Sequence, residues 1–195
     1  LTAPWFARAR FVQAQQGFRW GLDAAAALGD DSRKAAYAYY LAKIHLRQDN
    51  YAAARRLLDR AIQVFRTSAN QPRLADAYVD LADVALEEGN YVQATRNLEV
   101  AEVLYVQLHQ PVGIATVKCR QALIAYDAED DLTARRLCEE GLSCLPGTDG
   151  AIVRSRTLRL LTDLALRRRQ FEQAAEFCRQ AQAANQNVND PTEAA

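Results

Sequence analysis

Small and apolar residues return along the chain at a constant interval. Steps of 40 from Ala14 reach Ala54, Ala94, Ala134 and Ala174 without a gap. The residues four positions later are Phe18, Leu58, Leu98, Cys138 and Cys178, and those seven positions later are Gly21, Ala61, Ala101, Gly141 and Ala181. Because such offsets share one helical face, each copy predicts an α-helix with a face of small residues that a neighbouring helix can approach closely.

An aromatic residue usually stands three positions before each of these alanines. The residues at this position are Phe11, Tyr51, Tyr91, Asp131 and Phe171. Asp131 breaks the aromatic pattern, and we expect the neighbouring Leu132 to take the place of the missing ring.

A second helical pattern comes before each of the last four copies. Its landmarks are Leu41-Ala42, Leu81-Ala82, Gln121-Ala122 and Leu161-Thr162, followed by Ile44, Val84, Ile124 and Leu164. Short polar segments separate the two helices of a pair. In three of them, Asn50, Asn90 and Asp130 stand where a side-chain oxygen can accept a hydrogen bond from the first helical turn.

Longer polar breaks containing Pro72, Pro111 and Pro146 separate one helix pair from the next, and we expect these prolines to stop the preceding helix. Each pair is therefore predicted to be a helical hairpin. One hairpin cannot bury its own apolar face, so hairpins must stack on each other. The sequence thus predicts an all-α fold, a right-handed α-solenoid of antiparallel hairpins.

The predicted solenoid is a single unit over residues 1–185. A lone helix over residues 4–28 begins it, because Arg10 stands where the other copies have a capping residue. Hairpins follow over residues 33–70, 73–110, 112–146 and 151–184. Residues 185–195 carry no apolar stripe and are expected to fray. The chain starts at Leu1 without an initiator methionine, so we expect it to be part of a longer protein.

The pattern L-A-x-x-x-x-x-x-x-N-Y-x-x-A-x-x-x-L-x-x-A occurs from Leu41 to Ala61 and again from Leu81 to Ala101. It resembles the tetratricopeptide repeat, and the resemblance covers nearly all of residues 1–185. The usual aromatic residue in the middle of the first helix is absent, because that position holds His45, Ala85, Ala125 and Ala165. The interval also exceeds the typical ~34 residues. Long repeats of this kind resemble those of bacterial signalling and transcription regulators.

The resemblance implies a protein- or peptide-binding scaffold, of a class that rarely does chemistry itself, so we expect that the chain is not an enzyme. It also allows an alternative, in which the chain is the sensory or oligomerisation arm of a larger bacterial regulator. Family members that grip a C-terminal carboxylate use a set of lysine, arginine and asparagine residues. That set has no counterpart here, so this activity is not implied. Self-association through the terminal helices is a further expectation, with Phe171 and Phe177 as exposed apolar candidates.

The first helix of each hairpin is expected to line the concave, partner-binding side, with its Leu-Ala positions used for packing. The charged and aromatic residues on the opposite stripe are Tyr39, Tyr40, Lys43, Arg47, Asp76, Asp80, Asp83, Glu87, Arg120, Asp127, Arg156, Arg159 and Arg167. On this hypothesis the two tyrosines supply rigid contact area. The acidic central copy would favour a basic peptide, and the arginines of the last copy an acidic one.

These charges have a second interpretation that needs no ligand. Equivalent positions of successive copies lie on adjacent helices, and all four juxtapositions are of opposite sign: Lys43 with Asp83, Arg47 with Glu87, Asp80 with Arg120, and Asp127 with Arg167. Such a ladder of ion pairs would fix the register of the repeats. Against it, pairs of acidic residues four apart on one helix each cost a few tenths of a kcal/mol, which points to recognition. Both interpretations remain open.

The composition excludes several other classes of function. The 195 residues carry 24 basic and 24 acidic side chains, so no general attraction to nucleic acid or anionic membrane is expected. No apolar run is long enough to span a bilayer. The four cysteines lack metal-ligand spacing, and a reducing, cytoplasmic setting is expected. Cys138 and Cys178 occupy equivalent repeat positions and are predicted to be small buried hydrophobes. We expect no cofactor and no metal.

No catalytic motif occurs either. The two histidines, His45 and His109, fall in different contexts, the first at a helix packing position and the second in a connector. Cys144 stands near a turn without an identifiable acid–base partner. The sequence lacks a glycine-rich phosphate loop and the common hydrolase motifs.

Overall fold

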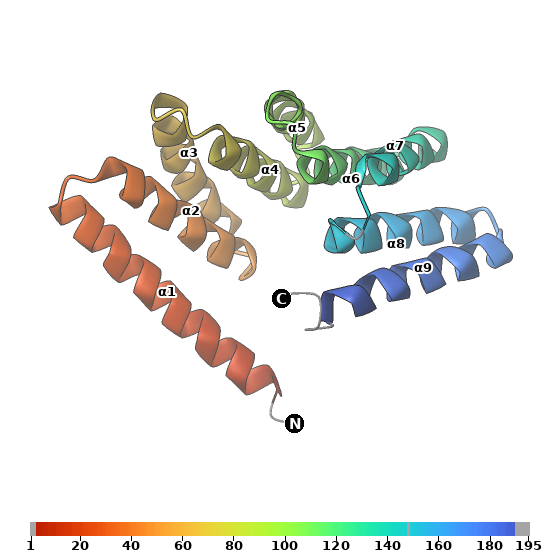
Figure 1. Cartoon of the computed structure of the whole chain (residues 1–195), viewed down its shortest axis with the longest axis horizontal. Helices are drawn as coiled ribbons and strands as arrows, with labels where there is room; N and C mark the ends of the chain where they lie inside the picture. Colours follow the sequence, from red (N-terminus) through yellow and green to blue (C-terminus); the bar gives the residue numbers. More distant parts are fainter. Residues whose placement is uncertain (1–2, 148, 190–195) are drawn as a thin grey trace. The chain divides into compact units, whose positions relative to one another are not determined.

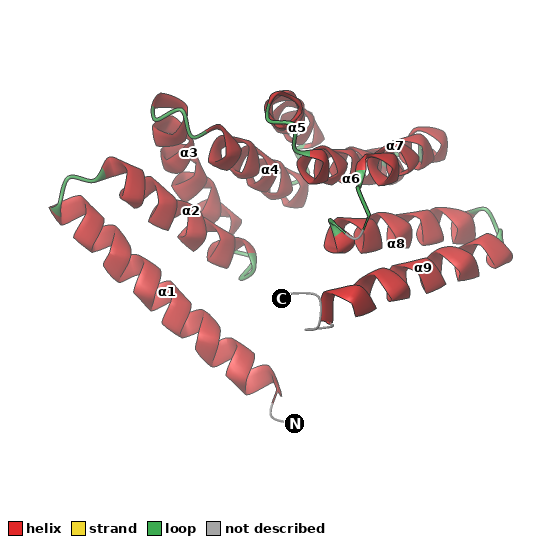
Figure 2. Ribbon diagram, viewed as in Figure 1, coloured by secondary structure: helices red, strands yellow, loops and turns green. Residues whose placement is uncertain are grey.

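The computed structural model describes residues 3–147 and 149–189, with side chains described from residue 12 to residue 185. Every regular element in these ranges is an α-helix (Figures 1 and 2). The helices are α1 (Ala3–Ala27), α2 (Asp31–Leu46), α3 (Tyr51–Thr67), α4 (Gln71–Glu87), α5 (Tyr91–Gln107), α6 (Pro111–Asp127), α7 (Asp131–Cys144), α8 (Ala151–Arg167) and α9 (Phe171–Asn189). The chain forms two compact units, Leu1–Leu104 and Tyr105–Ala195, and each is described by itself.

The turns between helices recur at half the interval of the repeat. At each of seven turns one residue adopts a left-handed conformation with φ between 52° and 72°: Gly29, Asp49, Ala69, Gly89, His109, Glu129 and Arg169. In the turn after α2, the N–H of Asn50 donates to the carbonyl of His45 at 2.9 Å, which closes the helix end. One interval of the repeat is therefore two helices with two similar turns.

The prediction of longer breaks between hairpins is wrong for most of the chain. Residues 68–70 and 108–110, which join one hairpin to the next, are as short as residues 88–90 and 128–130 within hairpins. Residues 145–150 form a longer connection. Pro72 and Pro111 lie in the first turn of α4 and α6, where a missing N–H costs nothing, so they begin helices rather than end them.

Side-chain caps occur at the N-terminus of first helices as well as second helices of the hairpins. The predicted caps are confirmed: Asn50, Asn90 and Asp130 accept bonds from the N–H groups of Ala53, Gln93 and Thr133 at 3.3, 3.0 and 3.1 Å. Two further caps were not predicted, Asp30 for α2 and Asn70 for α4, which accept from Arg33 at 2.9 Å and from Arg73 at 3.4 Å. Capping thus occurs between hairpins as well as within them.

In the first unit, α1, α2, α3 and α4 pack in chain order. The small-residue face of α3 is fully buried, with Ala54, Leu58 and Ala61 all 0% exposed. Gly21 of α1 lies against the ring of Tyr37, and a Cβ there would come within 2.7 Å of it. The predicted role of small residues in close helix approach is thereby confirmed.

In the second unit, α7 packs against both α6 and α8, and α9 packs against α8. Cys138 of α7 is 0% exposed within this core, and burial raises the pKa of its thiol to about 12. Gly141 lets α7 approach α6, since a Cβ there would lie 3.4 Å from the carbonyl oxygen of Ala115.

Three predictions for α7 and α9 differ from the structure. Cys178 is exposed, although Cys138 at the equivalent position is buried. Leu132 is 72% exposed and does not replace the missing ring, and the Asp131 carboxylate at the ring position pairs instead with Arg167 and Arg168. Helix α9 continues to Asn189, past the predicted start of the frayed tail at residue 185, whereas residues 190–195 lie outside the described ranges, as does the side chain of Phe11.

Phe171 is 64% exposed as expected, whereas Phe177 packs against the core of the second unit and is not an exposed apolar residue. None of the helices formed by the described residues is long and apolar enough to cross a membrane.

Candidate functional site

Helices α2 and α4 of the first unit bring together a cluster of charged and aromatic side chains, called here the α2–α4 surface: Tyr39, Tyr40, Lys43, Arg73 and Asp80. The Lys43 amine donates to the Tyr39 hydroxyl at 3.3 Å and lies 3.5 Å from a carboxylate oxygen of Asp80. The Arg73 guanidinium donates to the Tyr40 hydroxyl. These contacts join two successive hairpins through side chains of opposite or complementary polarity.

The two tyrosines of this surface pack against aromatic rings of α1 and α3. Tyr40 stacks on Phe18 of α1 with ring centroids 5.1 Å apart, and Tyr39 meets Phe65 of α3 edge-on at 6.1 Å. The Arg73 guanidinium lies 5.0 Å from the centroid of Tyr40 and 5.4 Å from that of Tyr39, within range of a cation–π interaction. Packed rings hold Arg73 and Lys43 in place.

Tyr39 does not supply the contact area that the sequence suggested. Its side chain is among the largest fully buried ones, with 2% of the residue exposed. Burial, followed by the nearby charges of Asp80 and Asp76, raises the pKa of its hydroxyl well above the ordinary value. Tyr40 is half-buried.

Asp80 is a buried carboxylate, with 8% of the residue exposed. Burial raises the pKa of Asp80 above its ordinary value, and the neighbouring Lys43 ammonium opposes that rise. One of its oxygens makes no hydrogen bond, and Lys43 is its ion-pair partner at 3.5 Å. The ionised form is therefore held chiefly by one partly exposed lysine.

Two of the four predicted ion pairs between repeats are replaced by pairs in a shifted register, and the Arg47–Glu87 pair stays a prediction. Lys43 pairs with Asp80 rather than with the expected Asp83, and Arg167 pairs with Asp131 rather than with Asp127. Side chains of one helix slant toward its N-terminus, so strict equivalence of position does not identify the nearest partner. Arg55 and Glu88 form another ion pair between successive hairpins, which the sequence pattern did not predict.

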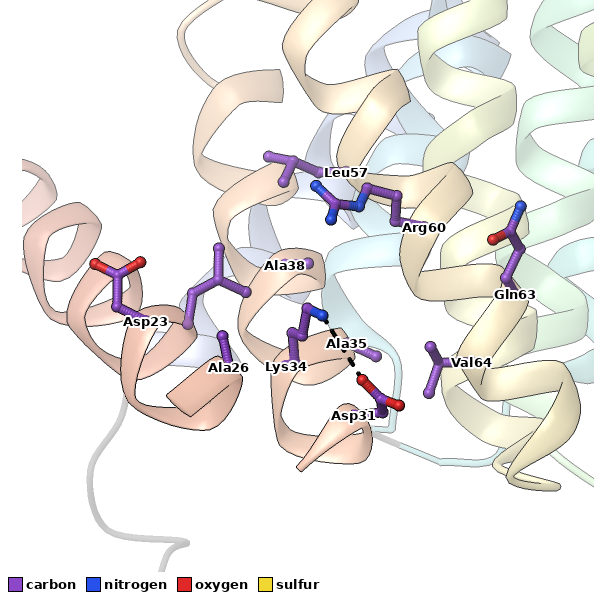
Figure 3. A pocket seen from close by; sticks show the side chains of 11 residues that line it. Asp23, Ala26, Asp31, Lys34, Ala35, Ala38, Leu57, Arg60, Gln63 and Val64 are labelled. Atoms are coloured by element: carbon purple, nitrogen blue, oxygen red, sulfur yellow. Dashed lines mark ion pairs between the residues drawn. The ribbon is translucent and has the colours of Figure 1, made fainter. Parts of the chain in front are cut away.

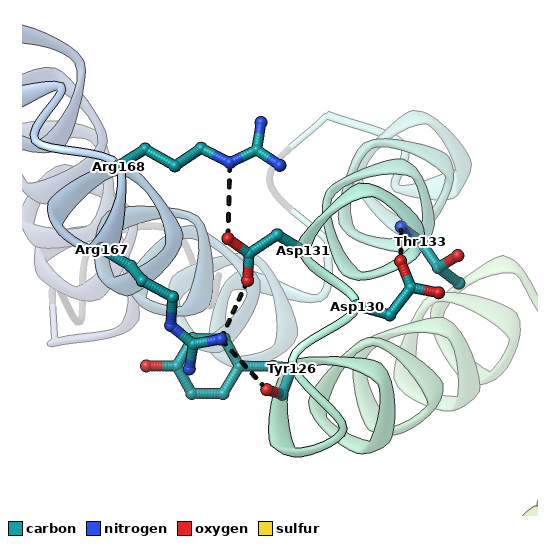
Figure 4. Close-up of polar contacts among 6 residues, drawn as sticks. All are labelled: Tyr126, Asp130, Asp131, Thr133, Arg167 and Arg168. Carbon is teal, nitrogen blue, oxygen red and sulfur yellow. Dashed lines mark hydrogen bonds and ion pairs between the residues drawn. The ribbon is translucent and has the colours of Figure 1, made fainter.

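In the second unit, Arg167 is the centre of a polar contact shown in Figure 4. Its guanidinium lies 3.7 Å from the ring centroid of Tyr126, bonds the Tyr126 carbonyl oxygen at 3.3 Å, and meets a carboxylate oxygen of Asp131 at 2.9 Å. Arg168 approaches the other oxygen of Asp131 at 3.4 Å. This arrangement ties α8 to α6 and α7, so Arg167 has a packing role and is not freely available to a ligand.

The other residues predicted for the binding face differ in exposure. Five of them are exposed and three are half-buried. The exposed ones are Arg47, Glu87, Asp127, Arg156 and Arg159, and the half-buried ones are Asp76, Asp83 and Arg120.

Arg120 and Asp80 belong to different compact units, so their pairing stays a prediction. The structure thus groups Tyr40, Lys43 and Asp80 on one surface and leaves the arginines Arg156 and Arg159 exposed on α8.

Arg73 was absent from the predicted set although it bonds Tyr40 and covers two rings. Its position could have been found. The stripe of Asp76, Asp80, Asp83 and Glu87 extends back by one helical turn to residue 73, at the start of α4.

The two histidines lie in different surroundings and in different compact units. His45 is half-buried with an unbonded Nδ1, and burial followed by the charges of Arg19 and Arg56 lowers its pKa. His109 is exposed at a turn. Among the described residues, no group of three or more His, Cys, Asp or Glu side chains could hold a metal ion.

The sequence and the fold resemble those of known helical-repeat proteins. Residues 22–104 match the family model described as tetratricopeptide repeat. BtubC from P. vanneervenii has a similar structure, with a TM-score of 0.73 and 18% identity over 97% of this chain and 80% of that chain. The apo form of RapI is similar over 95% of this chain, with a TM-score of 0.74 and 13% identity. This chain spans 52% of RapI, about half its length. No curated protein matches the sequence.

Proposed function

Because residues 22–104 belong to the tetratricopeptide repeat family, we propose that this chain is a scaffold that binds a protein or peptide through the α2–α4 surface. The tetratricopeptide repeat is in general a non-catalytic, protein-binding fold. The observation that carries the proposal is the polar cluster of Lys43, Arg73 and Asp80, which rigid rings hold at the junction of two hairpins. A preorganised surface binds with a smaller loss of conformational entropy.

A basic peptide is the ligand that we propose for this surface. Asp76, Asp83 and Glu87 lie on the same stripe as Asp80 and are more accessible than it. Asp80 itself is buried, so we assign the recognition of cationic residues to the more accessible acidic side chains on its stripe. By the same argument, Arg156 and Arg159 on α8 favour an acidic segment.

The proposal can be tested with peptides selected on the full chain from a random display library. We expect the selected peptides to be rich in lysine and arginine. A double variant, Asp76→Lys and Asp83→Lys, should bind them at least tenfold more weakly in fluorescence anisotropy, since about 1.4 kcal/mol of binding free energy corresponds to a factor of ten. Both changes leave the Lys43–Asp80 pair in place.

A matched control makes the same charge change on helices outside the α2–α4 surface. The double variant Asp59→Lys and Glu99→Lys alters two exposed acidic residues of α3 and α5. Equal loss of affinity in both double variants would attribute the effect to net charge and refute the proposed surface. Unchanged affinity in the first variant would refute it as well.

The second candidate function is the sensory or oligomerisation arm of a larger bacterial signalling regulator. The observation in its favour is the exposure of repeat positions at both ends, Ala14 in α1, and Phe171 and Cys178 in α9. These positions offer apolar surface to another chain. Sedimentation equilibrium discriminates the two functions, since only an oligomerisation arm self-associates in the absence of a peptide.

We also propose a reducing, cytoplasmic location. The four cysteines Cys119, Cys138, Cys144 and Cys178 are all free, which suits a compartment where thiols stay reduced.

A further inference from the structure

A pocket of about 330 Å³ lies in the first unit on another face of α2, where α1, α2 and α3 meet (Figure 3). Ala26, Ala35 and Ala38 line it together with Leu57 and Val64. Charged side chains stand around these small apolar residues, and this size is within the range of about 300–1,000 Å³ that ligand pockets occupy. The pocket does not include any residue of the α2–α4 surface.

The repeat explains why this pocket exists. A second pocket, of about 390 Å³, lies in the second unit among α7, α8 and α9. Every residue that lines it except Gly147 is equivalent, three repeat intervals later, to a residue that lines the first pocket; Leu158, for example, matches Ala38. The groove between neighbouring second helices of two hairpins is therefore a recurring feature of this fold.

In the copy that follows the first pocket, this groove holds a tyrosine. One repeat interval separates Tyr78 of α4 from Ala38, and the same interval separates Arg66 of α3 from Ala26. The Arg66 guanidinium donates a hydrogen bond to the Tyr78 hydroxyl, and the Tyr78 ring packs against the core of the first unit. Two alanines replace this arginine–tyrosine pair in the first copy and leave the space open.

Arginine and tyrosine are paired repeatedly in this molecule. Arg73 covers Tyr40 at 5.0 Å and Arg167 covers Tyr126 at 3.7 Å, and in both pairs the two residues come from different helices. At the first pocket, Arg60 of α3 lines the opening and has no hydrogen-bond or ion-pair partner among the described residues. Lys34 is already paired with Asp31 at 3.7 Å, so Arg60 is the cation that remains for a ligand.

We propose that the pocket between α1 and α3 binds a tyrosine side chain of a partner protein, with the ring over Ala38 and the Arg60 guanidinium beside the phenol or an adjacent carboxylate. The partner thus supplies from outside what Tyr78 supplies from within the next copy. This docking site is independent of the α2–α4 surface, and its occupant differs from the basic peptide proposed there.

The first test uses p-cresol, the side chain of tyrosine, as the probe on the full chain. Methyl resonances of Ala26, Ala35, Ala38 and Val64 should shift on titration, with half-saturation at about 1 mM, the affinity that a probe of this size reaches in an open pocket. The methyl group of Ala54, which is buried in another part of the unit, should not respond. Absence of shifts at the pocket methyls would overturn the proposal.

The second test fills the pocket, as Tyr78 does in the next copy. Ala38→Tyr reproduces Tyr78, Ala26→Leu fills the pocket from an exposed position of α1, and both should weaken p-cresol binding at least tenfold. Ala52→Tyr, at an exposed position of α3 outside the pocket, is the matched control and should bind p-cresol as the wild type does. If Ala38→Tyr fails to fold by circular dichroism, the leucine variant decides the outcome. Full binding by a folded variant would refute the pocket.

The third test concerns Arg60. N-acetyltyrosine, which carries a carboxylate, should bind several times more tightly than its amide, and Arg60→Gln should abolish that difference. Arg56→Gln on the same helix should preserve it, because Arg56 does not line the pocket. A difference that survives in Arg60→Gln would overturn the assigned role of this arginine.

Sedimentation velocity of the wild type and of Ala38→Tyr tests whether the chain dimerises through the pocket. A dimer that Ala38→Tyr dissociates would show that a second copy of this chain occupies the pocket, and the proposed tyrosine partner would then be wrong.

Discussion

Cys138 in α7 and Cys178 in α9 occupy the same position in successive copies of the repeat, yet the first is 0% exposed and the second is exposed. The helix α7 lies against both α6 and α8, whereas α9 packs against α8, and no further helix follows α9 in the described residues. Ala174 and Ala181 of α9, which flank Cys178 on the same stripe, remain buried at 4% and 5% exposure. A residue at this repeat position is therefore buried only when its helix also packs against the hairpin that follows.

Helix α1 shows the same difference in burial at another repeat position. Ala14 of α1 is exposed, while its equivalents Ala54, Ala94 and Ala134 are all 0% exposed. A repeat position is thus not buried or exposed because of its residue type. Its environment depends on the helices that the neighbouring copies supply, and this difference can be tested directly.

The largest expected effect comes from placing a charge at the two cysteine positions. Cys138→Arg buries an unpaired guanidinium in the core and should destabilise the chain by more than about 4 kcal/mol, enough to unfold a marginal unit. Cys178→Arg should change the free energy of unfolding by less than about 0.5 kcal/mol, as surface substitutions do. Urea denaturation followed by circular dichroism measures both, and equal losses would contradict the comparison.

The next effect is chemical reactivity of the same two thiols. Cys178 should react with N-ethylmaleimide at least about a hundredfold faster than Cys138, because the thiolate is the reactive form and burial raises the pKa of Cys138 to about 12. Peptide mass mapping over time gives the two rates. In concentrated guanidinium the rates should become similar, since unfolding removes the difference in environment.

The smallest expected effect is a difference in the pH dependence of stability between two aspartates whose pKa values shift in opposite directions. Burial raises the pKa of Asp80, so the folded state binds its proton more tightly than the unfolded state does. Its contribution to stability is therefore complete below about pH 4 and is lost as the pH rises through the folded-state pKa. Asp80→Asn should gain stability relative to the wild type as the pH rises above about 4 toward neutrality.

Asp130 is the matched control for this pH dependence. Its bond from Thr133 lowers the pKa of the carboxyl, so its contribution is present above about pH 4 and is lost at lower pH. Asp130→Asn should therefore lose stability relative to the wild type as the pH rises from acid to neutral. Unfolding free energies from urea titrations at several pH values measure both slopes, and slopes of the same sign would refute the assignment.

Much of the fold could be predicted because its causes are local. Helical periodicity identified the small-residue face, and the caps at Asn50, Asn90 and Asp130 were predicted from residue type and place alone. The turns were predicted less well. The sequence pattern predicts Pro72 and Pro111 as helix stops, although proline suits the first turn of a helix equally well. Only the position of the next helix distinguishes the two cases.

The candidate site was predictable to a smaller extent. The stripe of charged residues was correctly located on α2 and α4, but the ion pair of Lys43 and the burial of Tyr39 were not. Both depend on how side chains of adjacent helices slant and interdigitate, and a repeat interval carries no information about that. The Arg55–Glu88 pair could not be predicted for the same reason, whereas Arg73 lies one turn earlier on the acidic stripe and could have been included.

The sequence alone determines some properties of this protein, and packing between the repeat copies determines the others. Periodicity, capping residues and the constant interval specify where helices begin, which side of each is apolar and which family of folds results, because these properties arise locally along the chain. Whether Cys138 or Cys178 is hidden, which acid Lys43 meets, and whether Ala26 and Ala38 leave a pocket open follow from packing between copies. Those outcomes depend on side chains that are distant in sequence and adjacent in space.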